Sequence, residues 1–147
     1  MTTQTTGDAD FAIFRELIAE AMAATGGFGH REHVHLTWLA VRRVGMPDAL
    51  ALVGEGIRRT ATAAGAPQKF HTTMTRAWVE LVAGCVRESG RQDFAAFAAH
   101  HPELLDKGLL ALFYRPATLA SDEARAAWVE PDLAPLALRT DPVRDAD

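Results

Sequence analysis

The chain has 147 residues, of which 48% are hydrophobic and 23% are charged. This composition is that of one globular domain and excludes a disordered chain. The formal net charge is −4, and no basic patch is large enough to neutralise many phosphates, which argues against nucleic acid as a partner. The single cysteine, Cys85, excludes an internal disulfide framework.

The N-terminal residues 1–10 are rich in threonine and acidic residues. They have neither the basic start nor the apolar core of a signal peptide. No apolar run approaches the roughly 20 residues that span a bilayer. We therefore expect a cytoplasmic protein that does not insert into a membrane.

The apolar residues recur at spacings of three and four, which is the period of a helix, and strand signals are nearly absent. Glycines, prolines and capping residues divide this pattern into segments. We expect a first helix from Asp8 or Asp10 to Gly26, and then helices over about residues 29–45, 47–64, 67–87 and 92–99. Further along, Ser121 is placed to cap a final helix that runs through Trp128.

The expected fold is a compact all-α bundle of about six helices in one domain, residues 1–147. The second and fourth helices are expected to pack against each other. The tail from Pro131 is expected to wrap over the surface, and residues 1–8 and 137–147 are expected to be flexible.

The six histidines are unevenly placed, and His30, His33 and His35 fall within six residues. Positions three apart on a helix lie on one face, so we expect His30 and His33 to converge while His35 projects away from them. Two imidazoles on one helix do not complete a site. His71, near the start of the expected fourth helix, is the best candidate for a third ligand.

Polar side chains accompany these histidines at a distance of one helical turn. Thr37 follows His33, and Thr75 follows His71, with Trp78 nearby. If the two helices present these stripes to each other, they enclose a polar pocket within the bundle. Thr37, Thr75 and Trp78 are therefore candidates for contact with a bound molecule.

Neutral imidazole is a common ligand of transition metals, and three imidazoles with an open fourth position are typical of a catalytic site. We predict that His30, His33 and His71 bind one divalent transition metal. Zinc would lower the pKa of a bound water, whereas copper or iron would permit redox or oxygen chemistry. The ligand set does not choose among zinc, copper and iron.

Two residues are weaker candidates for proton transfer at this site. Glu32 points to another side of its helix, so the zinc-protease motif of two histidines four apart with a glutamate base is absent. Tyr114, the only tyrosine, offers a phenol to the pocket, although such a residue is more often the amphipathic edge of a core.

Two other interpretations stay open. In the first, His30 and His33 cap or decorate an exposed helix start, and His71 is a buried, hydrogen-bonded side chain. In the second, the pocket holds no metal and serves acid–base chemistry or ligand binding. His100 and His101 are expected to end a helix, where the helix dipole favours a cation.

Four segments, residues 28–33, 69–75, 121–125 and 128–133, carry a resemblance to a family. The chain resembles a set of short bacterial all-helical proteins that have no settled function and share the pattern Phe-x-His-x-x-His followed by Phe/Tyr-His-x-Thr-x-Thr. The likeness covers most of the chain from Phe28 to Leu136. It implies that His30, His33 and His71 belong together and that His35 is incidental, and it implies no particular reaction.

These features favour a metal-dependent enzyme that acts on a small molecule and activates water or oxygen at the metal. The competing class is a protein that binds a metal or a small ligand without turnover, and an interaction module with incidental histidines is the third. An enzyme needs an exchangeable position beside a cavity, whereas a storage or sensing site is usually filled.

Overall fold

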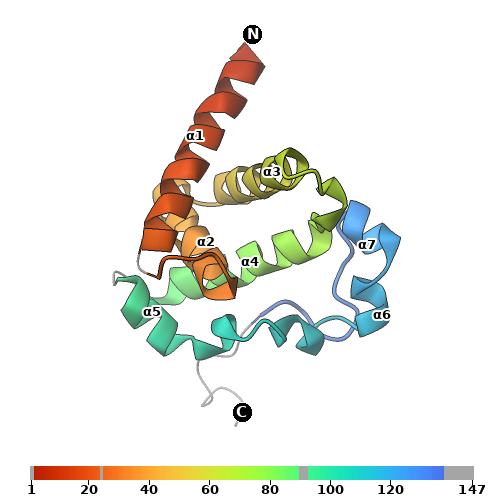
Figure 1. Ribbon diagram of the computed structural model, residues 1–147. Helices are drawn as coiled ribbons and strands as arrows, with labels where there is room; N and C mark the ends of the chain where they lie inside the picture. The colour runs from red at the N-terminus through yellow and green to blue at the C-terminus, as the bar shows by residue number, and fades with distance from the viewer. Residues whose placement is uncertain (1, 24, 90–92, 138–147) are drawn as a thin grey trace.

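The computed structural model describes residues 2–23, 25–89 and 93–137. Within these ranges the regular structure is helical, with seven α-helices and three short 3₁₀ helices (Figure 1). The all-α fold class predicted from the apolar periodicity is therefore confirmed. None of the helices in this part of the chain combines the length and the apolar character that crossing a bilayer requires.

Helices α2 (His30–Val44) and α4 (Thr72–Ser89) form the centre of the molecule and pack against each other, as predicted. Each of the two helices contributes buried side chains to two hydrophobic clusters. Val34 and Val82 belong to one cluster, and Leu36 and Val79 belong to the other. The pair is thus covered on both sides, which explains why apolar residues lie on more than one face of each helix.

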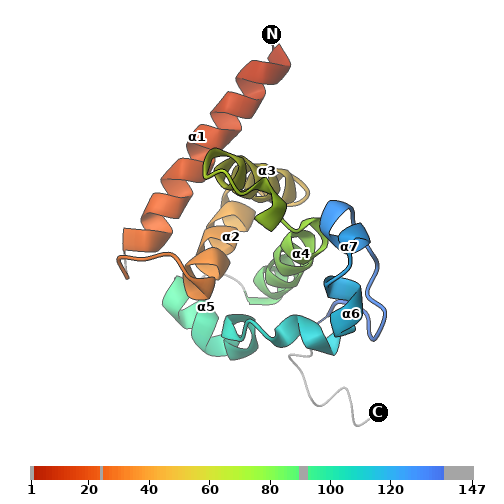
Figure 2. The same cartoon turned by 45° about the vertical axis from the view of Figure 1, so that its right-hand side comes forward.

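Helices α1 (Thr2–Ala23) and α3 (Asp48–Ala63) cover one side of this pair. Their close approach depends on a glycine, because a Cβ atom built on Gly56 would lie 2.2 Å from Cδ1 of the buried Phe14 ring. Figures 1 and 2 show the N-terminal turns of α1 extending beyond the rest of the molecule.

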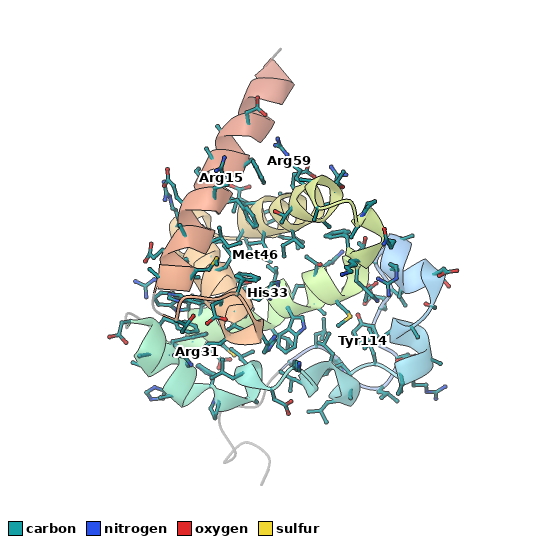
Figure 3. All side chains as sticks on the ribbon, in the orientation of Figure 1. Arg15, Arg31, His33, Met46, Arg59 and Tyr114 are labelled. Carbon is teal, nitrogen blue, oxygen red and sulfur yellow. The ribbon has the colours of Figure 1, made fainter. Side chains whose placement is uncertain are left out.

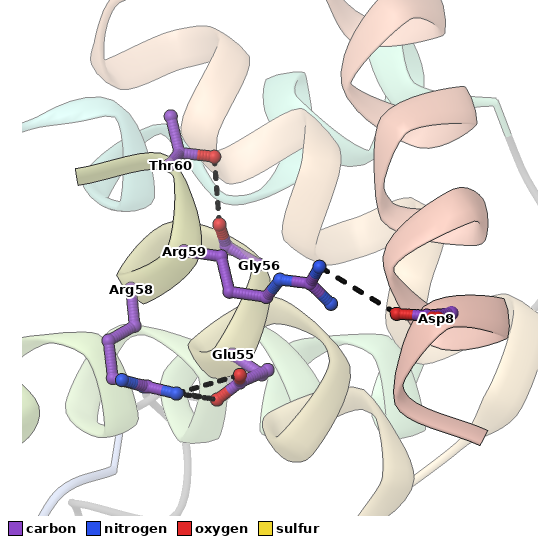
Figure 4. Close-up of polar contacts among 6 residues, drawn as sticks. All are labelled: Asp8, Glu55, Gly56, Arg58, Arg59 and Thr60. Carbon is purple, nitrogen blue, oxygen red and sulfur yellow. Dashed lines mark hydrogen bonds and ion pairs between the residues drawn. The ribbon is translucent and has the colours of Figure 1, made fainter. Parts of the chain in front are cut away.

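Polar contacts lie at the outer edge of the α1–α3 interface (Figure 4). The Arg59 guanidinium lies 3.8 Å from a carboxylate oxygen of Asp8 and over the ring of Phe11. Arg58 pairs with Glu55 on the same helix at 2.8 Å. Exposed ion pairs of this kind contribute little to stability, so the apolar contacts hold α1 in place.

The C-terminal half covers the other side of the central pair. Its helices are α5 (Phe94–His100), η2 (Pro102–Leu105), η3 (Leu109–Leu112), α6 (Pro116–Leu119) and α7 (Asp122–Ala126). Apolar side chains of α5, η2, η3 and α6 share one cluster with α2 and α4.

Hydrogen bonds fasten the chain that follows α7 to the core. The Thr73 hydroxyl of α4 donates to Ala127 O at 2.8 Å and accepts from the Val129 amide at 3.0 Å. Ala134 and Leu136 then pack against the cluster of the C-terminal half. The segment from Pro131 to Ala137 therefore wraps over the surface, as expected.

Three helix boundaries differ from the sequence prediction: the start of the first helix, the end of the last helix and the start of α4. Helix α1 begins at Thr2 rather than at Asp8 or Asp10, so residues 2–8 are helical. The last helix ends at Ala126, before Trp128, although Ser121 caps it as predicted by accepting from the Ala124 amide at 3.1 Å. Of the two ends expected to be flexible, Met1 and residues 138–147 lie outside the described residues.

The expected helix over residues 67–87 is interrupted near its start. A 3₁₀ helix, η1 (Pro67–Lys69), is followed by Phe70 with extended backbone angles, φ −69° and ψ 136°, and α4 begins at Thr72. His71 therefore precedes the helix instead of lying one turn inside it. At this position its side chain caps α4 instead of projecting from a helix face.

Candidate functional site

The N-terminal halves of α2 and α4 meet near the predicted histidine site. The His30 ring of α2 packs edge-on against the Trp78 ring of α4, with 4.6 Å between the ring centroids. Figure 3 shows His33 on the same part of α2, on the side toward α4. The two predicted stripes therefore meet at His30 and Trp78.

The two ring nitrogens of His71 are both engaged within the fold. Nδ1 accepts a hydrogen bond from the Met74 amide at 3.1 Å, which is the geometry of a side chain that caps a helix N-terminus. Nε2 donates to Leu119 O at 2.7 Å. His71 is thus buried and hydrogen-bonded, as one of the two alternative interpretations expected, and no ring nitrogen is left for a metal.

His30 is tied to the C-terminal half. Its Nε2 atom donates to Leu104 O at 2.9 Å, across 74 positions of sequence. Together with the contact to Trp78, this hydrogen bond fixes the plane of the ring. His30 therefore helps to hold η2 against α2.

His33 is half-buried, and its ring meets the edge of the Phe28 ring at a centroid distance of 6.4 Å. Among the described residues no hydrogen bond to its ring nitrogens is found. Burial, and secondarily the neighbouring His30, lowers the pKa of His33 to about 4. The His33 imidazole is therefore uncharged at neutral pH.

The described residues contain no group of three histidine, cysteine, aspartate or glutamate side chains arranged to hold a metal ion. The structure brings His30 and His33 together on one helix face, and it directs the nitrogens of His71 to backbone groups instead. His35 lies apart, as predicted, with its ring stacked on Phe94 at 4.2 Å.

The two threonines of the predicted stripes are both buried. The Thr37 hydroxyl donates to His33 O at 2.9 Å, within its own helix. The Thr75 side chain faces α3, where a Cβ atom on Gly54 would lie 4.0 Å from Thr75 Cγ2. Both residues line the interior of the bundle, and only Thr37 has a described hydrogen-bond partner for its hydroxyl.

Tyr114 and Glu32 have structural partners. The fully buried Tyr114 donates its hydroxyl to Val129 O at 2.7 Å, and burial raises the pKa of this phenol to about 12. Glu32 accepts from the Gly29 amide at 2.6 Å and from the Thr25 hydroxyl, and these bonds, that from Thr25 foremost, lower the pKa of the carboxyl. Neither side chain is hydrogen-bonded to a histidine.

A groove of about 370 Å³ opens between α1, α3 and the segment before α4, and the sequence analysis did not predict it. Its apolar lining consists of Phe14, Ile18, Phe28, Ile57, Ala61 and Phe70. Two polar side chains complete it, Thr60 and Lys69.

The sequence did carry a signal for this groove. Phe28 and Phe70 are the aromatic residues that open the two histidine patterns, and both lie in the connections just before a helix. Phe28 remains 44% exposed although it is large and apolar. An aromatic ring held partly open at a groove is the kind of group that a ligand covers.

Comparison with protein-family models, with curated proteins and with solved structures found no match.

Proposed function

We propose that the protein binds a small molecule with an apolar body and a carboxylate, in the groove between α1 and α3. The observation that carries this proposal is the groove itself, whose lining combines aromatic and aliphatic side chains with one cation, the exposed Lys69. Its volume of about 370 Å³ is at the lower end of the range for small-molecule sites, which favours a medium-chain ligand over a long lipid.

The charge at the groove supports an anionic ligand. Near the groove, Arg58 and Arg59 have acidic partners in Glu55 and Asp8. Lys69 is exposed and has no acidic partner among the described residues. An anion with an apolar tail therefore gains an ion pair and an apolar surface at the same place.

The apolar chain and the carboxylate of the ligand contribute different amounts to the free energy of binding. Burial of apolar area provides about 25 cal/mol per Å², whereas an exposed ion pair provides only about 0–1 kcal/mol. We therefore expect the apolar lining to supply most of the affinity, and Lys69 to supply the preference for an anion.

The test is a calorimetric titration with decanoate, a medium-chain carboxylate. Ala61→Trp fills the groove and should weaken binding at least tenfold, whereas Ala51→Trp, at an exposed position of the same helix, should leave it unchanged. Lys69→Gln should weaken binding a few-fold, because it removes only the rim charge. Lys107→Gln is the matched control, since Lys69 and Lys107 are the only lysines of the chain.

Decanoate that does not bind, or that binds equally well to the Ala61→Trp variant, would refute the proposal. Wild-type protein that self-associates and loses this association in the Ala61→Trp variant, without binding decanoate, would show that the groove takes a second copy of the chain instead.

A metal-dependent enzyme remains the second candidate, and the pairing of His30 and His33 on one face of α2 favours it. A zinc, copper or iron ion held by these residues with His71 would activate water or oxygen. To bind that ion, the His30 and His71 rings would have to leave Leu104 O and Leu119 O.

Metal analysis of the purified protein tests this second candidate. One equivalent of metal that is lost in both the His33→Ala and the His71→Ala variants is the result expected of a three-histidine site. Metal that survives the His71→Ala change would remove the third ligand and with it the predicted site.

A further inference from the structure

The residues that line the groove between α1 and α3 differ in how far they are exposed. Thr60 and Lys69 are exposed, and Phe28 is 44% exposed, so these three side chains form the rim. Phe14 also lines the groove, but only 1% of its surface is exposed. Its ring therefore lies at the bottom of the groove, and Lys69 lies at the opening.

The Phe14 ring packs against α3 at a residue that has no side chain. A Cβ atom built on Gly56 would lie 2.2, 2.3 and 2.5 Å from the ring atoms Cδ1, Cγ and Cε1. Glycine in the interior of a helix is less favourable than alanine. The presence of Gly56 in α3 is thus explained by the space that it leaves for the ring, and not by helix stability.

Other sides of the ring are filled as well. The Phe11 ring stacks on Phe14 with 5.8 Å between the centroids, and Phe14 belongs to the buried cluster of α1 and α3. The Arg59 guanidinium covers Phe11 and reaches across to Asp8 of α1 (Figure 4). The groove is the open space beside the ring, so a side chain added at residue 56 would move the ring into the groove.

We infer that Phe14, held in place by Gly56, is the floor against which the apolar end of the ligand stops, and that the protein thereby selects linear carboxylates by chain length. This inference rests on the proposed function, because it assigns the carboxylate to Lys69 and the chain to the groove. Each methylene that enters the groove leaves water and adds affinity, whereas a methylene beyond the floor stays in water and adds none.

The test is a calorimetric series of even-numbered linear acids from hexanoate to tetradecanoate. For wild-type protein the affinity should rise about fourfold per methylene, the value of burying one methylene, and should stop rising at about decanoate. Phe14→Leu lowers the floor, and an apolar cavity of this kind takes up apolar groups, so the rise should continue to dodecanoate. Gly56→Ala raises the floor, so the rise should end at octanoate.

Two further variants show whether the contact between the two residues is the cause. Gly54→Ala is the matched control on α3, because its Cβ atom would lie 4.0 Å from Thr75 Cγ2, an ordinary van der Waals contact, and it should give the wild-type series. The double variant Gly56→Ala/Phe14→Leu should return the end of the series to decanoate, because the smaller side chain makes room for the added Cβ atom.

The outcomes separate this inference from the proposed function. If none of the acids binds, both fail. If decanoate binds in a manner that Ala61→Trp weakens, but the series ends at the same length in wild type, Phe14→Leu and Gly56→Ala, only the role of Phe14 and Gly56 is refuted. Equal weakening of every acid by Gly56→Ala also overturns it, since α1 would then have moved away from α3. Should Gly56→Ala fail to fold, a longer series in Phe14→Leu supports the inference and an unchanged one refutes it.

Discussion

Both ring nitrogens of His71 are used within the fold, and this single residue joins two parts of the chain. Nδ1 caps α4, and Nε2 reaches Leu119 O, 48 positions away. An acceptor at Nδ1 and a donor at Nε2 together define one neutral tautomer. The side chain thus links the start of α4 to the end of α6 through two hydrogen bonds.

Replacing His71 should therefore destabilise the protein in the absence of any metal. His71→Ala removes a cap, at a cost of about 1 kcal/mol, and leaves the Leu119 carbonyl without its donor, at a further cost of about 1–3 kcal/mol. His71→Asn retains the cap but is too short for Leu119, so it should recover only the smaller part. Urea unfolding of chelator-treated protein measures the loss of unfolding free energy in both variants. A His71→Ala variant as stable as wild type would contradict the role of His71 in linking α4 to α6.

Residue spacing in the sequence predicts which side chains share a helix face, and it does not predict their partners. The convergence of His30 and His33 and the separation of His35 follow from the helical period alone. The partners of His30 and His71 are backbone carbonyls of the C-terminal half, which only the tertiary fold brings near. The sequence alone also does not show that, among the described residues, His30 has a hydrogen-bond partner and His33 has none.

At the scale of the elements, local capping and breaker signals located most helices of the described chain. Ser121 was predicted as an N-cap and accepts from the Ala124 amide. Proline at residue 67, expected at the start of a long helix, instead begins the short η1, since the cap supplied by His71 fixes a later start for α4. A histidine cap is not among the usual start signals, which explains the shift.

The groove also arises at this scale, because no single helix contains it. Phe14 and Ile18 come from α1, Ile57 and Ala61 from α3, and Phe70 from the connection to α4. The sequence identified each of these as apolar, and an apolar residue of a helix is most often part of the core. Only the relative placement of three separate segments shows that these side chains leave a space between them.

At the scale of the whole molecule, the central pair α2 and α4 separates two environments. The groove opens on the side covered by α1 and α3, whereas Tyr114 and the segment around Val129 belong to the C-terminal half. That half holds the carbonyls to which His30 and His71 are bonded. The C-terminal half therefore positions the starts of α2 and α4, next to the groove residues Phe28 and Phe70, and does not line the groove itself.

The burial of histidine side chains in the folded molecule predicts how its stability depends on pH. Burial lowers the pKa of three histidines, His33, His35 and His101, and for His33 the pKa falls from 6.5 to about 4. The unfolded chain then takes up protons at a higher pH than the folded chain does. Stability should be constant above about pH 6.5 and fall as the pH drops from 6.5 toward 4, with His33 contributing a loss of up to about 3 kcal/mol.

Glutamate and aspartate act in a lower window, because the lowered pKa values of Glu32 and Asp132 make their contributions disappear only below about pH 4.5. Urea unfolding between pH 7.5 and 5.0 therefore isolates the histidines. His33→Gln removes one protonation site, so the stability difference between wild type and this variant should shift in favour of the variant as the pH falls. Parallel stability curves for the two proteins would show that the His33 ring is not held neutral by the fold.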